Sequence, residues 1–127
     1  MSHITKLQTK MTDVDCIKEA LEEGGFTYTE NGVAVAYGSQ KIKGDIIAHQ
    51  SGRAFDIAFV KQGDDTYSIE ADWYGRGIKR EDFIKQITQN YAAAKIVKEI
   101  QNDPRISMLD KEKLPNGTER IRIGVLV

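Results

Sequence analysis

Hydrophobic and polar side chains alternate most regularly between residues 53 and 74. Every second side chain is apolar in both halves of this stretch, as in half-buried antiparallel strands. The apolar positions are Phe55, Ile57 and Phe59 in the first half and Tyr67, Ile69, Ala71 and Trp73 in the second. Aligning the two sets predicts a hairpin in which Phe59 lies opposite Tyr67, with Lys61–Asp65 as a five-residue loop.

The same register gathers carboxylates on the other face of the hairpin. It places Asp56 directly opposite Glu70, with Cβ atoms roughly 5 Å apart, and Asp72 two residues further along. Like charges at that distance repel, so we expect a nearby cation, open solvent or a retained proton to offset the repulsion. Together with Tyr74, these acids are the candidate binding residues of the chain. Asp56, Glu70 and Asp72 are also candidate oxygen ligands for a divalent cation such as Mg²⁺ or Ca²⁺.

Two segments have apolar residues at helical spacing. Asp13–Glu23 carries one apolar stripe, follows Thr12 as the expected N-cap, and is stopped by Gly24-Gly25. A longer helix is predicted from about Arg80 to about Gln101, with a broad apolar stripe and acids in its first turn. We expect this helix to lie across the apolar face of the central hairpin.

The remaining segments predict further strands. Ile4–Thr9 is a first strand, and Asn31-Gly32 lies between two alternating segments, which predicts a tight hairpin turn. Asp45–His49 is another strand, and Thr118–Val127 is the last strand of a final hairpin. The sequence therefore predicts one α+β domain over residues 1–127. Its mostly antiparallel sheet has about six to eight strands, and two main helices pack on one face.

Composition narrows the class of protein. The 127 residues are 40% hydrophobic and 29% charged, with a formal net charge of −1, so no global positive field indicates nucleic acid or anionic membrane. The single cysteine, Cys16, excludes an intramolecular disulfide and a cysteine-based zinc site. The first residues lack a signal-peptide core, and no run reaches the roughly 20 apolar residues of a membrane span. We expect a cytoplasmic protein, or one in the plastid stroma, with no membrane partner.

Six short motifs in a fixed order resemble one known family. They are Met1-Ser2-His3, Tyr37-Gly38, Phe55-Asp56-Ile57-Ala58-Phe59, Ala71-Asp72-Trp73, Gln89-Asn90-Tyr91-Ala92 and Asn116-Gly117. Together they are similar to the hypothetical chloroplast reading frame thirty-five family, a small domain of unknown function from cyanobacteria, algal plastids and bacterial viruses. That family favours Gly in place of Ala58, so the pattern departs there. The resemblance spans nearly the whole chain and implies an α+β domain, but it brings no reaction, cofactor or site residue.

The first functional hypothesis is a binding or adaptor module. It would dock on a macromolecular partner through an open sheet face or an edge strand. An acidic face suits a basic protein and repels nucleic-acid phosphates, so a protein partner is favoured over nucleic acid. Arg120 and Arg122 are the modest support for a nucleic-acid partner.

Two alternatives stay open. The acidic group could form a metal or small-ligand site, joined by His3 or His49, and the domain could then be an enzyme. No HExxH, phosphate-loop or EF-hand spacing supports this, so an enzymatic role is open but not favoured, and no cofactor is evident. The chain could instead be a structural subunit that forms homo- or hetero-oligomers, with the C-terminal strand as a pairing edge.

Overall fold

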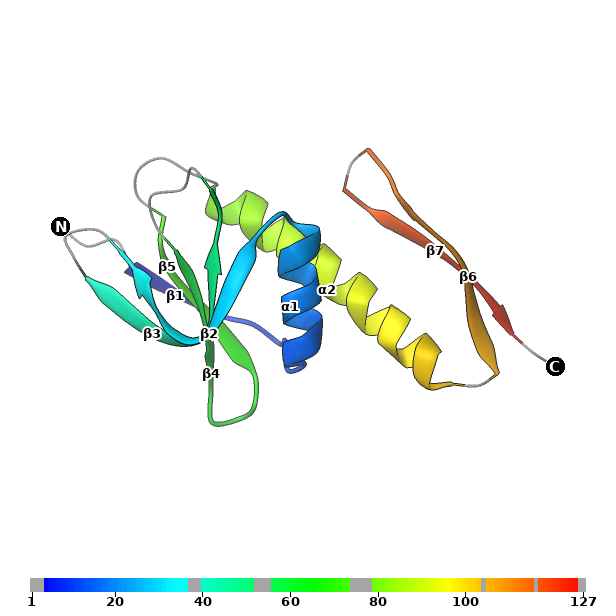
Figure 1. The fold of residues 1–127 in the computed structure, drawn as a ribbon, viewed down its shortest axis with the longest axis horizontal. Helices are drawn as coiled ribbons and strands as arrows, with labels where there is room; N and C mark the ends of the chain where they lie inside the picture. Colours follow the sequence, from blue (N-terminus) through cyan, green and yellow to red (C-terminus); the bar gives the residue numbers. More distant parts are fainter. Residues whose placement is uncertain are drawn as a thin grey trace.

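A computed structural model describes residues 4–36, 40–51, 56–73, 79–103, 105–115 and 117–125 of the chain. The elements follow one another as one strand, a helix, four strands, a second helix and a final strand pair (Figure 1). They are β1 (Ile4–Gln8), α1 (Val14–Glu23), β2 (Thr27–Val35), β3 (Lys41–His49), β4 (Ile57–Lys61), β5 (Tyr67–Asp72), α2 (Arg80–Asn102), β6 (Ile106–Lys113) and β7 (Glu119–Val125).

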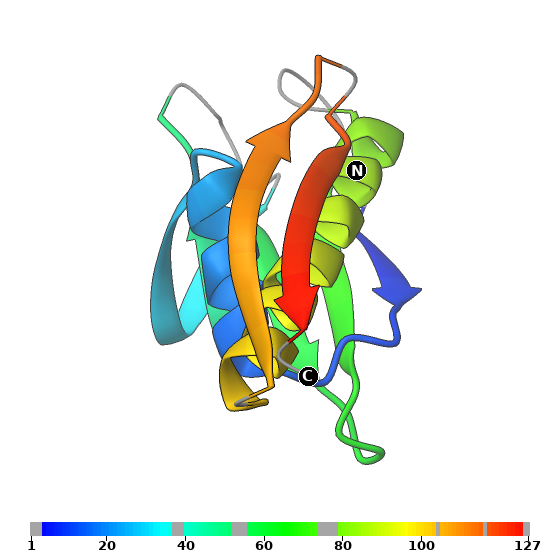
Figure 2. The ribbon, with the colours of Figure 1, turned by 90° about the vertical axis from the view of Figure 1, so that its right-hand side faces the viewer.

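The described elements form three layers. Five strands pair antiparallel in the order β1-β5-β4-β3-β2, and both helices cover one face of this sheet. The two-stranded β6–β7 sheet lies on the other side of the helices, so that it crosses in front of α1 and α2 in Figure 2. The predicted α+β class, antiparallel pairing and two helices on one face are confirmed. The seven strands divide between two sheets.

The core lies between the helices and the five-stranded sheet. Apolar side chains of the central hairpin, among them Phe59 and Ile69, pack there against Leu21 of α1 and Phe83 of α2. Phe83 also meets the ring of Phe26 edge-on, with ring centroids 5.4 Å apart. The prediction that the long helix lies across the apolar face of the hairpin is confirmed. Neither helix combines the length and apolar character of a membrane span over the described residues.

The predicted register of the central hairpin is wrong. Phe59 lies opposite Ile69, and Lys61 lies opposite Tyr67, so that the loop is Gln62–Thr66. In the loop, the Gln62 N–H donates to the Thr66 carbonyl at 2.7 Å, and Asp65 has a left-handed φ of 68°. Sliding one strand by two residues keeps every side chain on its face, so the apolar pattern is satisfied by both registers and the loop decides between them.

The predicted Asn31-Gly32 hairpin turn is also wrong. β2 continues through both residues and stays in register with β3, pairing on either side of Asn31. Asn31 does adopt the left-handed conformation that the motif favours, with φ 51°. Here that conformation bends a continuous strand instead of reversing it, because β3 supplies a partner along the whole length of β2.

Gly32 and Gly44 lie opposite each other at this bend. A Cβ on Gly44 would lie 2.9 Å from Ile47 Cδ1 and 3.0 Å from Ala58 Cβ, so the strands approach closely only because position 44 has no side chain. Beyond the bend, the end of the β2–β3 hairpin curls over the second face of the sheet. Ala34 there packs with Ile47 and Ala58 in a second apolar cluster.

The second face is therefore covered, whereas the sequence predicted an open face. Ser68 is fully buried and Asp72 is 5% exposed, although both lie on the face predicted to be open. The alternation itself is confirmed, since Ala58 and Val60 lie in the second cluster while Ile57 and Phe59 lie in the main core.

The N-cap of α1 is Asp13 rather than Thr12. The Asp13 Oδ1 atom accepts from the backbone N–H groups of Asp15 at 3.1 Å and Cys16 at 3.3 Å. The Thr12 and Asp13 N–H groups both donate to the hydroxyl of Tyr91, which fixes the start of α1 on α2. A carboxylate at the cap also forms ion pairs with Lys95 and Lys98 of α2, which a neutral threonine could not do.

We predict that Gly44→Ala lowers the free energy of unfolding by about 1–3 kcal/mol, because the new methyl group meets Ala58 Cβ and the Phe59 carbonyl at the bend. Urea denaturation of the purified variants measures the effect. Gly63→Ala is the matched control, since a Cβ at that loop position meets nothing within 4 Å, and we expect it to change stability by at most about 0.5 kcal/mol. Equal stability of the two variants would show that the bend tolerates a side chain.

Candidate functional site

The structure does not show the predicted pairing of Asp56 with Glu70. Ala58 lies opposite Glu70 in place of the predicted Asp56, and Lys6 of β1 flanks Glu70 on its other side. Asp72 is buried at the end of β5. Tyr74, the fourth candidate, lies outside the described residues. The described part of the chain contains no group of three His, Cys, Asp or Glu side chains arranged to hold a metal ion.

Asp56 lies just before β4 and joins three segments of the sheet. Its Oδ1 atom is 2.7 Å from Nδ1 of His49 at the end of β3. Its Oδ2 atom accepts from the Val35 N–H of β2 at 3.0 Å, and its own N–H donates to the Val35 carbonyl at 3.2 Å. His49 Nε2 lies 3.3 Å from Thr29 Oγ1, so this hydrogen-bonded chain returns to β2.

The chain from Thr29 through His49 to Asp56 has the order of groups found in nucleophilic catalysis, a hydroxyl, an imidazole and a carboxylate. Here both carboxylate oxygens are occupied, one by the imidazole and the other by the Val35 backbone. The arrangement therefore holds the Asp56 carboxylate against the backbone of β2. We interpret it as a positioning network for that strand.

β2 is the more informative surface, and sequence reasoning missed it. The strand lies at one edge of the five-stranded sheet. Two of the three exposed large hydrophobic side chains among the described residues are on it, Val33 at 43% and Val35 at 46% exposed. The apolar residues that follow Gly32 indicated a strand. The predicted turn at Asn31-Gly32, however, treated that strand as the second half of a tight hairpin and not as the end of an edge strand.

The backbone of β2 offers hydrogen-bonding groups at this edge. Both backbone groups of Val35 bind Asp56 and so point away from β3. In an antiparallel ladder every second residue points the same way, which turns the N–H and C=O groups of Val33 outward as well. Before the bend at Asn31 the alternation is reversed, because Ile46 and Ala48 of β3 pair with β4, so that the outward groups there are those of Tyr28 and Glu30. Among the described residues, no other segment binds these outward groups. An unpaired edge of this kind is a template for another strand.

Two exposed lysines of β3 flank the exposed valines. Lys43 lies directly opposite Val33, and Lys41 lies opposite Val35, so each lysine shares a face with its valine. Neither lysine forms an ion pair with any carboxylate that the structure describes. We call Val33, Val35, Lys41 and Lys43 the β2 edge patch.

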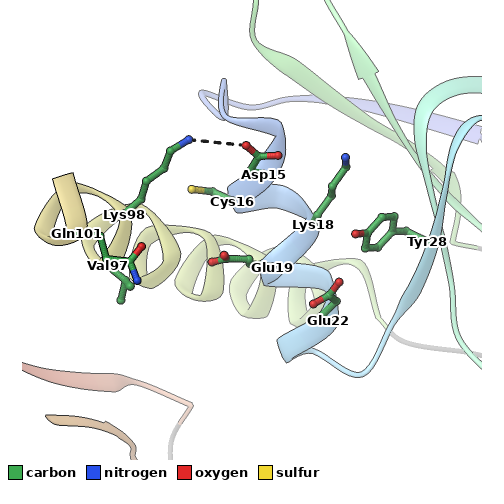
Figure 3. A pocket seen from close by; sticks show the side chains of 9 residues that line it. All are labelled: Asp15, Cys16, Lys18, Glu19, Glu22, Tyr28, Val97, Lys98 and Gln101. Carbon is green, nitrogen blue, oxygen red and sulfur yellow. Dashed lines mark ion pairs between the residues drawn. The ribbon is translucent and has the colours of Figure 1, made fainter. Parts of the chain in front are cut away.

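A groove of about 410 Å³ separates α1 from α2 near the start of β2 (Figure 3). It is lined by Asp15, Cys16, Lys18, Glu19, Glu22, Tyr28, Val97, Lys98 and Gln101. Burial raises the pKa of the Cys16 thiol, so the cysteine is a packing residue and not an activated nucleophile.

The cations of the groove are already engaged. Lys18 forms an ion pair with Glu30, and Lys98 Nζ lies 2.6 Å from Asp13 Oδ2 and 4.0 Å from Asp15 Oδ2. The hydrogen bond from Lys98 is the main cause that lowers the pKa of Asp13 from 3.8 to about 2, against a smaller effect of burial. These pairs join α1 to its neighbours, which favours a structural role for the groove over a ligand site.

Comparison with known proteins gives a family but no function. A family model described as "Protein of unknown function (DUF1257)" matches residues 20–121. The chain is 27% identical over 126 residues to "Uncharacterized protein ycf35" of Guillardia theta, covering 97% of this chain and 96% of that protein. It is 29% identical over 125 residues to the protein of the same name from Cyanophora paradoxa, covering 95% and 94%. These relatives confirm the resemblance seen in the sequence. No solved structure matches the chain.

We predict that Mg²⁺, Ca²⁺ and Mn²⁺ leave the melting temperature unchanged, because both Asp56 oxygens are bound within the protein. A cation that binds only the folded state would raise the melting temperature by mass action. Thermal melts with and without each cation measure this, with EDTA-treated protein as the reference. A rise that disappears in Asp56→Asn and in Glu70→Gln would restore the predicted acidic metal site.

We predict that the Asp13 carboxylate stabilises the fold at neutral pH and loses this effect as the pH falls from about 4 to about 2. Its folded pKa of about 2 lies below the ordinary pKa of 3.8 for an aspartate, so protonation favours unfolding across that window, by about 2 kcal/mol in total. Urea titrations at a series of pH values measure the slope. Asp13→Asn keeps a capping oxygen and removes the titrating group, so its stability should fall less steeply over the same window. Equal slopes for the two proteins would contradict this assignment.

Proposed function

The chain belongs to the DUF1257 family, whose function is unknown, and from the geometry of β2 we propose that it is a protein-binding module. It docks on a partner, as an adaptor would, by accepting an extended segment along the β2 edge. The observation that carries the proposal is an edge strand with two exposed valines and outward backbone groups. The predicted open sheet face carries it less well, because Ser68 and Asp72 are buried.

Strand addition fits the energetics of this edge. Main-chain hydrogen bonds supply affinity, and side chains on alternate positions supply specificity. Each bond contributes about 0.5–1.5 kcal/mol net, and an apolar partner side chain beside Val33 adds buried apolar surface. An extended segment along residues 27–33 could use the outward groups of Tyr28, Glu30 and Val33 at once.

The opposite edge of the sheet is less suited to a partner. β1 carries the exposed Lys6 in its centre, and a lysine on an edge strand discourages further pairing. Beyond Asn31, where the strand changes the face that it presents, the side chains of β2 that share the face of Val33 are limited to Val35, and both are uncharged. This asymmetry between the two edges favours β2 as the recognition edge.

A structural role in an oligomer remains a separate proposal. β7 pairs with β6 on one side, and among the described strands none pairs with its other side. A second copy could therefore pair with β7, as the sequence suggested for the C-terminal strand. Size measurement over a range of protein concentrations tests this surface independently of β2.

We predict that Val33→Pro weakens binding of an extended peptide about tenfold or more. Proline removes an outward N–H and places its ring at the edge, but it breaks no bond to β3, because the backbone groups of Val33 point away from that strand. Peptides selected from a random seven-residue display library are the ligands, and isothermal titration calorimetry measures their affinity.

Val33→Thr is the matched control, since it keeps the N–H and the branched shape, and we expect affinity within about threefold of the unchanged protein. Backbone amide shifts in NMR spectra locate the bound peptide. Binding that shifts the amides of Tyr28, Glu30 and Val33 supports the proposal. Selected peptides that bind Val33→Pro normally, or that shift only amides of the α1–α2 groove, would contradict it.

A further inference from the structure

We infer that the segment accepted by β2 is acidic, with carboxylate side chains on the same face as Val33 and Val35. This inference rests on the proposed strand addition and specifies the chemistry of its partner. The expected charge of the partner is opposite to the one predicted from the sequence, where an acidic sheet face suggested a basic partner. The change follows from the surface that the fold exposes, which is the β2 edge patch and not the Asp56–Asp72 face.

The lysines of the patch lie within reach of an added strand. Lys43 stands beside Val33, and Lys41 beside Val35, on the face that both strands share. Neighbouring strands lie about 4.8 Å apart, so an added strand runs roughly 10 Å from β3, with Val33 between. A lysine side chain and a glutamate side chain together span this distance, with their aliphatic parts lying over the valine.

The charges already present at this edge favour acid over base. Beyond Asn31, β2 contributes only Val33 and Val35 to this face, and neither lysine has a described carboxylate partner. Glu30, the one acid of β2, is paired with Lys18 of α1. An incoming carboxylate therefore finds two unpaired ammonium groups, whereas an incoming lysine would meet like charge.

The chain itself provides an example of a carboxylate bound at this edge. Asp56 places one carboxylate oxygen on the Val35 N–H and its own N–H on the Val35 carbonyl, as a residue of an added strand would engage the backbone. His49 holds the carboxylate in place. Asp56 thereby closes the ladder at Val35 and leaves Thr27–Val33 for the partner, a segment of about seven residues.

The inference is tested with three synthetic seven-residue peptides, acetylated and amidated at their ends. All three alternate Val or Thr with a variable residue, which is Glu in the first, Ser in the second and Lys in the third. We expect affinity in the order Glu, Ser, Lys, with the Glu peptide about tenfold tighter than the Ser peptide at low ionic strength. This preference should weaken as salt is added.

The double variant Lys41→Glu/Lys43→Glu separates charge recognition from strand addition. We expect it to reverse the order of the peptides, while binding of the Ser peptide and the melting temperature change little, since both lysines are exposed and unpaired among the described residues. Lys79→Glu/Lys85→Glu is the matched control, because it changes the net charge equally at exposed positions of the α2 region and should preserve the order.

Each outcome decides one part of the proposal. Equal binding of the three peptides, all lost in Val33→Pro, would overturn the acidic partner and leave strand addition standing. Binding of none would overturn both. Tighter binding of a single-stranded oligothymidylate than of the Glu peptide, lost in Lys41→Glu/Lys43→Glu, would assign the patch to nucleic acid and overturn the inference.

Discussion

The close approach of β2 and β3 at Gly32 and Gly44 is the constraint on which the surface of this domain depends. A Cβ at position 44 would lie 3.0 Å from Ala58 Cβ, so a side chain there would force the coiled strands apart. The bend carries Ala34 over the second face, where it closes the surface above Ala58. The same bend leaves the valines of β2 exposed at the edge. The same steric constraint thus buries the predicted binding face and exposes the edge of β2.

The coiling also explains why Asp56 does not meet Glu70. Once the end of β2 curls back over the sheet, its Val35 backbone comes within hydrogen-bonding distance of the residue before β4. One backbone N–H and an imidazole then bind the Asp56 carboxylate, which relieves the like-charge problem that the predicted register would create. Asp56, which the sequence predicted as part of a site on the sheet face, instead binds Val35 and marks the end of the open part of the β2 edge.

Sequence patterns predicted the helices and strands of this fold better than they predicted the contacts between them. The stripe of α2 and the alternation of β4 and β5 predicted which faces are buried, because burial of apolar surface acts on each element separately. Period-two alternation cannot distinguish registers that differ by an even shift, so the loop at Asp65 had to decide. The Asn31-Gly32 pair predicted the local backbone correctly and the topology wrongly, since only the long pairing with β3 shows that the strand continues.

The two lysines beside the exposed valines resolve a difficulty that any open edge raises. A neutral, β-branched edge strand would pair readily with its own copy and aggregate. Pairing of β2 with β2 of a second molecule would bring Lys41 and Lys43 of both chains to one face, three strand spacings or about 14 Å apart, where like charges repel weakly at low ionic strength. An acidic segment removes that repulsion, whereas a second copy increases it. The two lysines therefore disfavour self-association of the edge and favour an acidic partner. An open edge can in this way remain specific for one kind of partner.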